Sequence, residues 1–325
     1  MSEEESLTYA ETGVDIEASE EATAALIDAI GSVDADDFAG VLDIGDRYLA
    51  LATDGVGTKL LVAEAIGDYT TIGIDCIAMN VNDLVAMGIT PLGFVDYLAV
   101  DEPDERLTAE IGEGLATGAS EANISLMGGE TAVLPEVVTG FDLAGACVGI
   151  AQKGELLTGA AAPGDVLVGF PSSGIHSNGL TLARAAATRN HDYTDPFPPD
   201  PAISIGEALL TPTALYTDLL PAMHAVDARG AAHITGGGWT NLFRLGEFAY
   251  DIDSPHPAQP IFEFIAAEGN IAEEECYRTF NMGTGFVVCV PPTSAEEFIE
   301  LTGGRRIGTV DTGASVAIAG LSLTP

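Results

Sequence analysis

The stretch from Ile72 to Met87 is almost entirely apolar, and no other segment constrains the fold of this 325-residue chain as strongly. Its length and composition predict a helix that ends at Gly88, before Thr90-Pro91. Apolar side chains would occupy nearly every side of this helix, so the rest of the protein must cover it. Four polar residues interrupt the stretch: Asp75, Asn80, Asn82 and Asp83.

Carboxylates in a buried helix need partners, because burying an unpaired charge is costly. Asp75 and Asn82 are seven residues apart and therefore nearly share one face, with Asp83 beside them. A divalent cation that bridges to a phosphate would compensate both carboxylates. Caps and hydrogen bonds to neighbouring loops would also satisfy them, so both explanations stay open.

A second informative segment is the heptapeptide Thr53-Asp54-Gly55-Val56-Gly57-Thr58-Lys59, which follows an apolar, strand-like run. Its two glycines would let backbone N–H groups approach a ligand closely. The Lys59 ammonium could meet phosphate oxygens, and Asp54 could hold Mg²⁺. The spacing differs from that of the Walker loop, so a turn with a surface lysine explains the segment about equally well.

The charge balance is extreme, with 50 acidic and 11 basic residues and a net charge of −39. Such a surface disfavours binding to nucleic acid and to anionic membranes. The acids are dispersed, which favours adaptation to a salt-rich cytoplasm over a basic protein partner, since the Debye length falls to about 3 Å in molar salt. No apolar run could cross a bilayer and the acidic N-terminus lacks a signal-peptide flank, so we expect a soluble cytoplasmic protein.

The remaining pattern predicts two α/β series of similar size. In the first, we expect helices over 20–30, 72–87 and 104–123 and strands over 92–100, 124–127 and 141–151. In the second, we expect strands over 165–170, near 231–234 and near 284–290, and helices near 204–209, 213–226 and 294–301. The sequence AAAPG at 160–164 indicates a boundary, which gives domains of residues 1–158 and 159–325.

Three glycine-containing loops carry further candidates. Met127-Gly128-Gly129-Glu130-Thr131 predicts a tight turn that presents Glu130 at the end of a strand, where its carboxylate would suit Mg²⁺ and not zinc. The segment 172–179 precedes an apolar helix and could bind an anion, with His176 either as a ligand or as part of the loop. A loop from His233 to Gly238 repeats this pattern. The other histidines are expected on the solvated surface: His191, His224 and His256.

In this order, the segments resemble those of the aminoimidazole ribonucleotide synthetase family. The matching stretches are Tyr9 with Gly13-Val14-Asp15-Ile16, TDGVGTK at 53–59, residues 71–92, GGETA at 128–132, SSGIHSNG at 172–179, HITGGG at 233–238 and YRTFNMGTG at 277–285. They span nearly the whole chain. Any one motif is degenerate, but TDGVGTK, VNDL and YRTFN together are specific within a superfamily of enzymes that activate a substrate by ATP-dependent phosphorylation.

The resemblance implies an α/β (α+β) fold of two domains, an N-terminal dimerisation domain whose sheet pairs with its twofold mate and a C-terminal α/β sandwich. It implies a homodimer that uses ATP and Mg²⁺. The implied reaction is a C–N bond-forming cyclo-ligation in purine biosynthesis, in which formylglycinamidine ribonucleotide is closed to aminoimidazole ribonucleotide through an iminophosphate.

The resemblance also assigns roles to individual residues. Metal ligands would be Asp54, Asp83 and Glu130. Nucleotide contacts would come from Asp54, Gly55, Gly57, Thr58, Lys59, Asp75, Asn82 and Asp83. The substrate would be bound by His176, Asn178, Gly236, Gly237 and Arg278. Catalysis would fall to His233, Lys59 and Asp83.

One region departs from the family pattern. Relatives often carry a basic, glycine-rich loop before TDGVGTK, whereas residues 31–40 are acidic and contain neither Lys nor Arg. We expect the nucleotide to be covered differently here. Two alternatives stay open: a formylglycinamidine ribonucleotide synthetase-like ligase, which would not be expected to carry YRTFN, and a nucleotide-binding protein without turnover, against which the full set of carboxylates argues.

Overall fold

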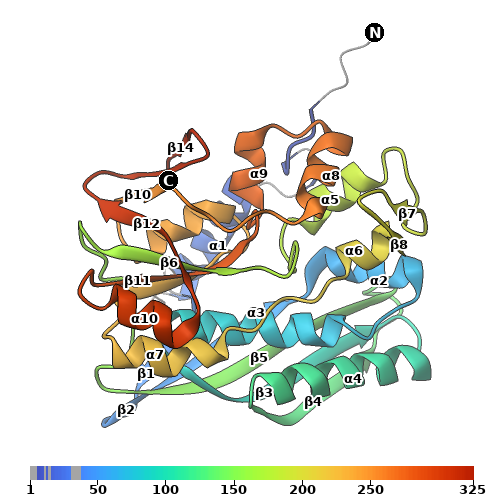
Figure 1. The fold of residues 1–325 in the computed structure, drawn as a ribbon. Helices are drawn as coiled ribbons and strands as arrows, with labels where there is room; N and C mark the ends of the chain where they lie inside the picture. The colour runs from blue at the N-terminus through green and yellow to red at the C-terminus, as the bar shows by residue number, and fades with distance from the viewer. Residues whose placement is uncertain (1–5, 11, 14–15, 31–37) are drawn as a thin grey trace.

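The computed structural model describes residues 6–10, 12–13, 16–30 and 38–325, and two sheets organise it (Figure 1). The first sheet has the strand order β1-β2-β5-β3-β4 and is antiparallel except for the β3–β4 pair. Its strands are β1 (Gly40–Asp43), β2 (Arg47–Gly55), β3 (Thr90–Val100), β4 (Ser125–Val133) and β5 (Phe141–Gln152).

The second sheet lies in the other half of the chain, with the order β14-β13-β10-β12-β6-β11-β9. Its strands are β6 (Val166–Pro171), β9 (Gly230–His233), β10 (Ala249–Ile252), β11 (Thr284–Val290), β12 (Arg305–Asp311), β13 (Ser315–Ile318) and β14 (Leu321–Leu323). Every residue of β11 is buried. Phe286 and Val288 enter one apolar core and Val287 and Cys289 enter the other, so both faces of this sheet are covered.

Helices cover the sheets. Those in the first half are α1 (Ile16–Ile30), α2 (Leu60–Ile66), α3 (Ile72–Ala86) and α4 (Glu105–Glu121). Those in the second half are α5 (Leu180–Ala187), α6 (Ile205–Leu209), α7 (Leu220–Ala225), α8 (Pro260–Gly269), α9 (Glu273–Thr279) and α10 (Ala295–Thr302). Within the described part of the chain, no helix has both the length and the apolar character needed to cross a membrane.

The predicted buried helix is confirmed as α3. It packs on β2 and β5 of the first sheet, on β9 of the second and on α4 (Figure 1). The α3–α4 contact is close because it is built on glycines: a Cβ on Gly73 would lie 2.3 Å from the backbone nitrogen of Leu115. Helix α3 therefore brings residues from both halves of the chain together.

The first sheet has an apolar outer face. Along β5, buried residues alternate with less buried residues that face the outer side of the sheet. Leu51, Val95 and Tyr97 pair with three of these outward-facing residues, Val148, Ala146 and Ala144. Leu51 and Tyr97 are 55% and 45% exposed. Large apolar side chains are therefore exposed on this open face of the sheet.

Several elements differ from the sequence prediction. The helix expected over 213–226 begins only with the 3₁₀ turn Thr217–Leu219 and α7, because side chains of α3 bind the preceding backbone. The helix expected near Trp239 is a 3₁₀ helix, Gly238–Leu245. The sequence did not predict the short pair β7 (Pro196–Phe197) and β8 (Asp200–Ser204). It also did not predict β10, β12, β13, β14, α8 or α9.

The prediction of a tight turn at Gly128-Gly129-Glu130 is wrong. Strand β4 runs through these residues to Val133 in parallel pairing with β3, and a bulge between Phe94 and Val95 accommodates the glycines. The acidic stretch 31–37 and parts of the motif over 9–16 lie outside the described residues.

Candidate functional site

The polar face of α3 binds an extended segment from the second half of the chain, Thr211–Tyr216, which we call the strap. The Asp75 Oδ1 atom accepts hydrogen bonds from the Thr213 amide at 2.8 Å and the Thr213 hydroxyl at 2.6 Å. Seven residues on, the Asn82 side chain donates to the Ala214 carbonyl at 2.9 Å and accepts from the Tyr216 amide at 3.1 Å. Asp75 and Asn82 do share one face, as predicted, and that face binds protein.

Lys59 lies at the centre of this region and is fully buried. Its ammonium is 2.8 Å from both carboxylate oxygens of Asp75 and donates to the Thr211 carbonyl at 2.7 Å. Burial lowers the pKa of Lys59, and the Asp75 carboxylate opposes that shift. The sequence predicted a lysine that faces phosphate or solvent, whereas in the structure the ammonium binds protein groups.

A His–Asp pair lies at the end of β9. The His233 ring is fully buried, and its Nδ1 atom is 3.0 Å from Oδ1 of Asp83, whose side chain is 18% exposed. The Asn82 amide nitrogen lies 3.4 Å from Nε2 of the same ring. The Tyr216 and Phe286 rings pack around His233 at centroid distances of 6.4 and 6.3 Å.

Asp54 stands near the end of β2, on the face of the sheet that α3 covers. Burial first, and the nearby Asp83 carboxylate second, raise the pKa of Asp54 from 3.8 to about 6. A buried carboxylate whose charge is disfavoured by a second carboxylate is a suitable place for a cation. The role of Asp54 and Asp83 as metal ligands stays a prediction.

Glu130 lies elsewhere. Glu130 pairs with Tyr97, and Tyr97 lies on the outer side of the sheet. Asp54 pairs with Gly145 on the inner side. Among the residues that the structure describes, no three His, Cys, Asp or Glu side chains are grouped closely enough to hold a metal. A single site made of Asp54, Asp83 and Glu130 is therefore not assembled within this chain.

The two histidine loops lie close together in the structure. His176 is fully buried with a positive φ of 66°. Its Nε2 atom accepts from the Ser173 amide at 3.2 Å and lies 3.5 Å from the Ala214 nitrogen, while its Nδ1 atom has no hydrogen-bond partner. Burial holds the pKa of His176 well below its usual value. Its ring centroid lies 6.5 Å from that of His233.

The other predicted substrate residues divide into two groups. A Cβ on Gly236 would lie 3.6 Å from the Asn178 amide oxygen, so these two loops approach each other, and Gly237 adjoins them with a positive φ of 88°. The Arg278 backbone contacts Gly238, but the Arg278 guanidinium binds Glu274 at 3.2 Å and the Thr324 carbonyl at 3.3 Å. Among the five residues predicted to bind the substrate, Arg278 is therefore the one whose side chain binds groups at the protein surface.

In the heptapeptide over residues 53–59, Gly57, Thr58 and Lys59 form a 3₁₀ turn that leads into α2. Gly57 has a positive φ of 69° and open space where a Cβ would stand. The Thr58 hydroxyl lies 2.9 Å from the Thr181 hydroxyl of α5. This loop therefore adjoins the helix that follows His176 and Asn178.

Sequence reasoning missed three residues of the site region. Thr213 and Tyr216 lie in a segment predicted as helix, and no local pattern distinguishes them. Asp54 of β2 and Asp96 of β3 both pair with Gly145 of the strand between them, β5. Burial raises the pKa of Asp96. The signal for Asp96 was available, since it is a carboxylate at an inward-facing position of an otherwise apolar strand.

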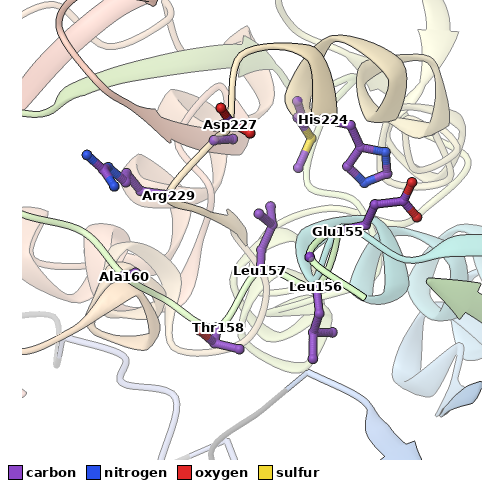
Figure 2. A pocket seen from close by; sticks show the side chains of 11 residues that line it. Glu155, Leu156, Leu157, Thr158, Ala160, His224, Asp227 and Arg229 are labelled. Carbon is purple, nitrogen blue, oxygen red and sulfur yellow. The ribbon is translucent and has the colours of Figure 1, made fainter. Parts of the chain in front are cut away.

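The other histidines hold the fold together. His224 Nε2 is 2.8 Å from the Gly88 carbonyl and His256 Nε2 is 2.9 Å from the Gly169 carbonyl, so the predicted solvated positions are wrong for these two. A hollow of about 240 Å³ lies beside His224, between Gly154–Ala160 and Asp227–Arg229 (Figure 2). None of the predicted site residues lines it.

The raised pKa of Asp54 has a measurable consequence. Between its ordinary pKa of 3.8 and about 6, the folded state keeps a proton that the unfolded chain has lost, so stability falls as the pH rises through this window. We expect Asp54→Asn to raise the free energy of unfolding above pH 6 by about 2 kcal/mol relative to wild type. Thermal unfolding across the pH range, at constant KCl concentration, measures this.

The matched control is Asp46→Asn, because the Asp46 side chain is 85% exposed. Its pH profile should follow that of the wild type. Parallel profiles for Asp54→Asn and the wild type would contradict the assigned pKa.

Comparison with known proteins identifies the family of this chain. The family model described as "AIR synthase related protein, N-terminal domain" matches residues 36–151, and that for the C-terminal domain matches residues 162–319. The phosphoribosylformylglycinamidine cyclo-ligase of Methanosarcina barkeri is 46% identical over 318 residues, which cover 94% of this chain and 96% of the relative.

Solved structures share the fold at lower identity. Thiamine monophosphate kinase from Aquifex aeolicus gives a TM-score of 0.66 at 17% identity and covers 96% of this chain and 100% of its own. The hydrogenase maturation protein HypE, solved in complex with ATP, gives 0.61 at 17% identity and covers 85% and 83%. The chain therefore belongs to the AIR synthase related family and, within it, to the group of phosphoribosylformylglycinamidine cyclo-ligases.

Proposed function

We propose that this protein closes the imidazole ring of aminoimidazole ribonucleotide from formylglycinamidine ribonucleotide, with hydrolysis of ATP to ADP and phosphate. The observation that carries the proposal is the His233–Asp83 pair beside Asp54, between a glycine turn and the two histidine loops. Full-length similarity to proteins that bear the cyclo-ligase name supports it.

The chemistry needs a leaving group. A formyl oxygen leaves poorly, so the γ-phosphoryl group of ATP is placed on it to form an iminophosphate, and the neighbouring nitrogen attacks within the same molecule. His233 is suited to move a proton or stabilise the oxygen in this sequence, because Asp83 orients its ring. Phosphoryl transfer itself depends on positioning and charge neutralisation.

Asp54 and Asp83 would hold Mg²⁺, which neutralises phosphate charge when it is bound. Their mutual repulsion supports this, since a cation would relieve it. Gly55, Gly57 and Thr58 would contact the nucleotide, in keeping with the ATP complex of the HypE relative. The predicted contact of Asn82 does not fit, because both ends of its buried amide bind the strap. Glu130 would contribute from the outer face of the first sheet, where a second subunit lies in the proposed dimer.

The substrate would lie between the loops of His176 and Gly236. The unpartnered Nδ1 atom of His176 and the unpartnered hydroxyl of Ser177 support this, because buried polar atoms without partners suit a polar ligand. Asn178 and Gly237 would contact the same ligand. Arg278 would reach it only after release from Glu274.

We propose a homodimer through the outer face of the first sheet, supported by its exposed apolar side chains. Leu51→Asp places a charge in this face and should raise the dimer dissociation constant at least about tenfold. Sedimentation velocity in molar KCl measures this. Leu301→Asp is the control, since Leu301 is 59% exposed on α10; equal behaviour of the two variants would contradict the interface.

We propose that the enzyme works in a salt-rich cytoplasm, which its net charge of −39 supports. We also propose a domain boundary between residues 158 and 159, within the segment that joins β5 to β6.

The test is a coupled ADP-release assay in molar KCl that compares formylglycinamidine ribonucleotide with its amide precursor. ADP release with formylglycinamidine ribonucleotide alone is the expected result. Release only with the amide precursor plus glutamine or ammonia would reject the cyclo-ligase function in favour of the synthetase alternative.

A further inference from the structure

The strap Thr211–Tyr216 connects the buried Lys59–Asp75 ion pair to the His233 ring. At one end, Asp75 Oδ1 accepts from both the amide and the hydroxyl of Thr213. At the other end, the Tyr216 amide binds Asn82, and the Tyr216 hydroxyl donates to the Pro171 carbonyl at 2.9 Å. The strap is therefore fixed between α3 and the second sheet.

The strap fixes the orientation of the Asn82 amide. Its oxygen accepts from a backbone N–H, that of Tyr216, and its nitrogen donates to a backbone carbonyl, that of Ala214. A flipped Asn82 amide would place its NH₂ group against the Tyr216 N–H and its oxygen against the Ala214 carbonyl, so neither hydrogen bond could form. The NH₂ group must therefore face Nε2 of His233, at 3.4 Å.

The amide in turn fixes the tautomer of His233. Because a donor faces Nε2, that nitrogen must be unprotonated in the neutral ring, and the proton resides on Nδ1, which donates to Asp83. Tyr216 also packs against the ring with its centroid 6.4 Å away. One strap thus sets both the position and the tautomer of the imidazole.

The ion pair explains why the strap keeps this course. Lys59 also donates to the Thr211 carbonyl, so the ammonium binds both Asp75 and the start of the strap. A buried ion pair contributes little net stability, so the contribution of this pair lies in geometry: Asp75 Oδ1 accepts from the Lys59 ammonium and from the Thr213 amide and hydroxyl. With Lys59 fully buried, no atom of its ammonium is free for a ligand at the surface.

We propose that Lys59, Asp75 and Thr213 are positioning residues that hold His233 in the Nδ1–H tautomer through the strap and Asn82. The inference rests on the proposed function only in taking His233 as the catalytic group. It replaces direct contact between Lys59 and a nucleotide phosphate with an indirect role in the same site.

The test uses Thr213→Val, which keeps the shape and the backbone amide but removes the hydroxyl bound to Asp75, and Thr213→Ser, which restores the hydroxyl. We expect Thr213→Val to lower kcat about tenfold, the rate equivalent of one hydrogen bond to a charged group, with the KM for ATP nearly unchanged. Thr213→Ser should behave as the wild type. Thermal unfolding verifies that both variants fold.

A second readout does not depend on turnover. Histidine nitrogen-15 NMR of the full-length protein distinguishes the two tautomers, and the His233 signals are identified by their loss in His233→Gln. The wild type should show protonated Nδ1 and bare Nε2, and Thr213→Val should show a mixture of tautomers.

The outcomes separate the two proposals. A wild type that does not turn over formylglycinamidine ribonucleotide, but whose His233 tautomer changes in Thr213→Val, rejects the proposed function and supports the positioning role. An unchanged tautomer and unchanged kcat in Thr213→Val overturn the positioning role. So does a Lys59→Met variant that loses ATP affinity more than tenfold in direct binding measurements while Thr213→Val retains it.

Discussion

Lys59→Met is expected to lower the free energy of unfolding by about 3–5 kcal/mol, because it leaves the Asp75 carboxylate buried without its counter-charge. Methionine has nearly the length and volume of the lysine stem, so lost packing contributes little. Both side chains of the pair are fully buried, so water cannot replace the ammonium. Urea unfolding in molar KCl, followed by circular dichroism, measures the loss.

The control is the double variant Lys59→Met/Asp75→Leu, which removes both charges. It should recover most of the lost stability, because an apolar pair of similar volume replaces a buried ion pair at little cost. Lys153→Met is the surface control, since Lys153 binds Asp43 with a side chain that is 38% exposed, and it should lower stability far less than Lys59→Met does. A Lys59→Met variant as stable as Lys153→Met would refute the structural role of the pair.

The fold was predictable where one local pattern decides it. The apolar run of α3 could only be a buried helix, and β3, β5, β6 and β11 read clearly as apolar strands. The short strands β10, β13 and β14, with three or four residues each, carry too little pattern to be recognised. The glycines of β4 favour a turn locally, and only pairing with β3 keeps them in a strand.

The sequence singled out individual polar residues of this region, but it did not predict the contacts that connect them. Asp75 illustrates the limit: its burial required a partner, and the sequence left open whether that partner was a cation or a protein loop. The structure supplies Lys59 and Thr213, the second of which is 138 residues away. Contacts at such separation overrule the helical propensity of 213–216, and no local pattern reports them.

His233→Gln is expected to lower kcat for ring closure by about 10²–10⁴, the usual contribution of a positioned acid or base. Glutamine keeps a polar group next to Asn82 but can neither accept nor release a proton. Since the ring is fully buried beside the stacked rings of Tyr216 and Phe286, the affinity for ATP should change little. Steady-state kinetics by ADP release, together with direct ATP binding, separate the two effects.

His191→Gln is the matched control, because His191 is a half-buried histidine that lies beside a carboxylate, with its Nε2 atom 3.4 Å from Glu268. Its kcat should equal that of the wild type. Asp83→Asn should reproduce much of the loss, because an amide cannot accept the Nδ1 proton of His233 in the orientation that places its NH₂ group toward the ring. A His233→Gln variant with full kcat would remove His233 from the chemistry and leave the His233–Asp83 pair as a structural contact between β9 and α3.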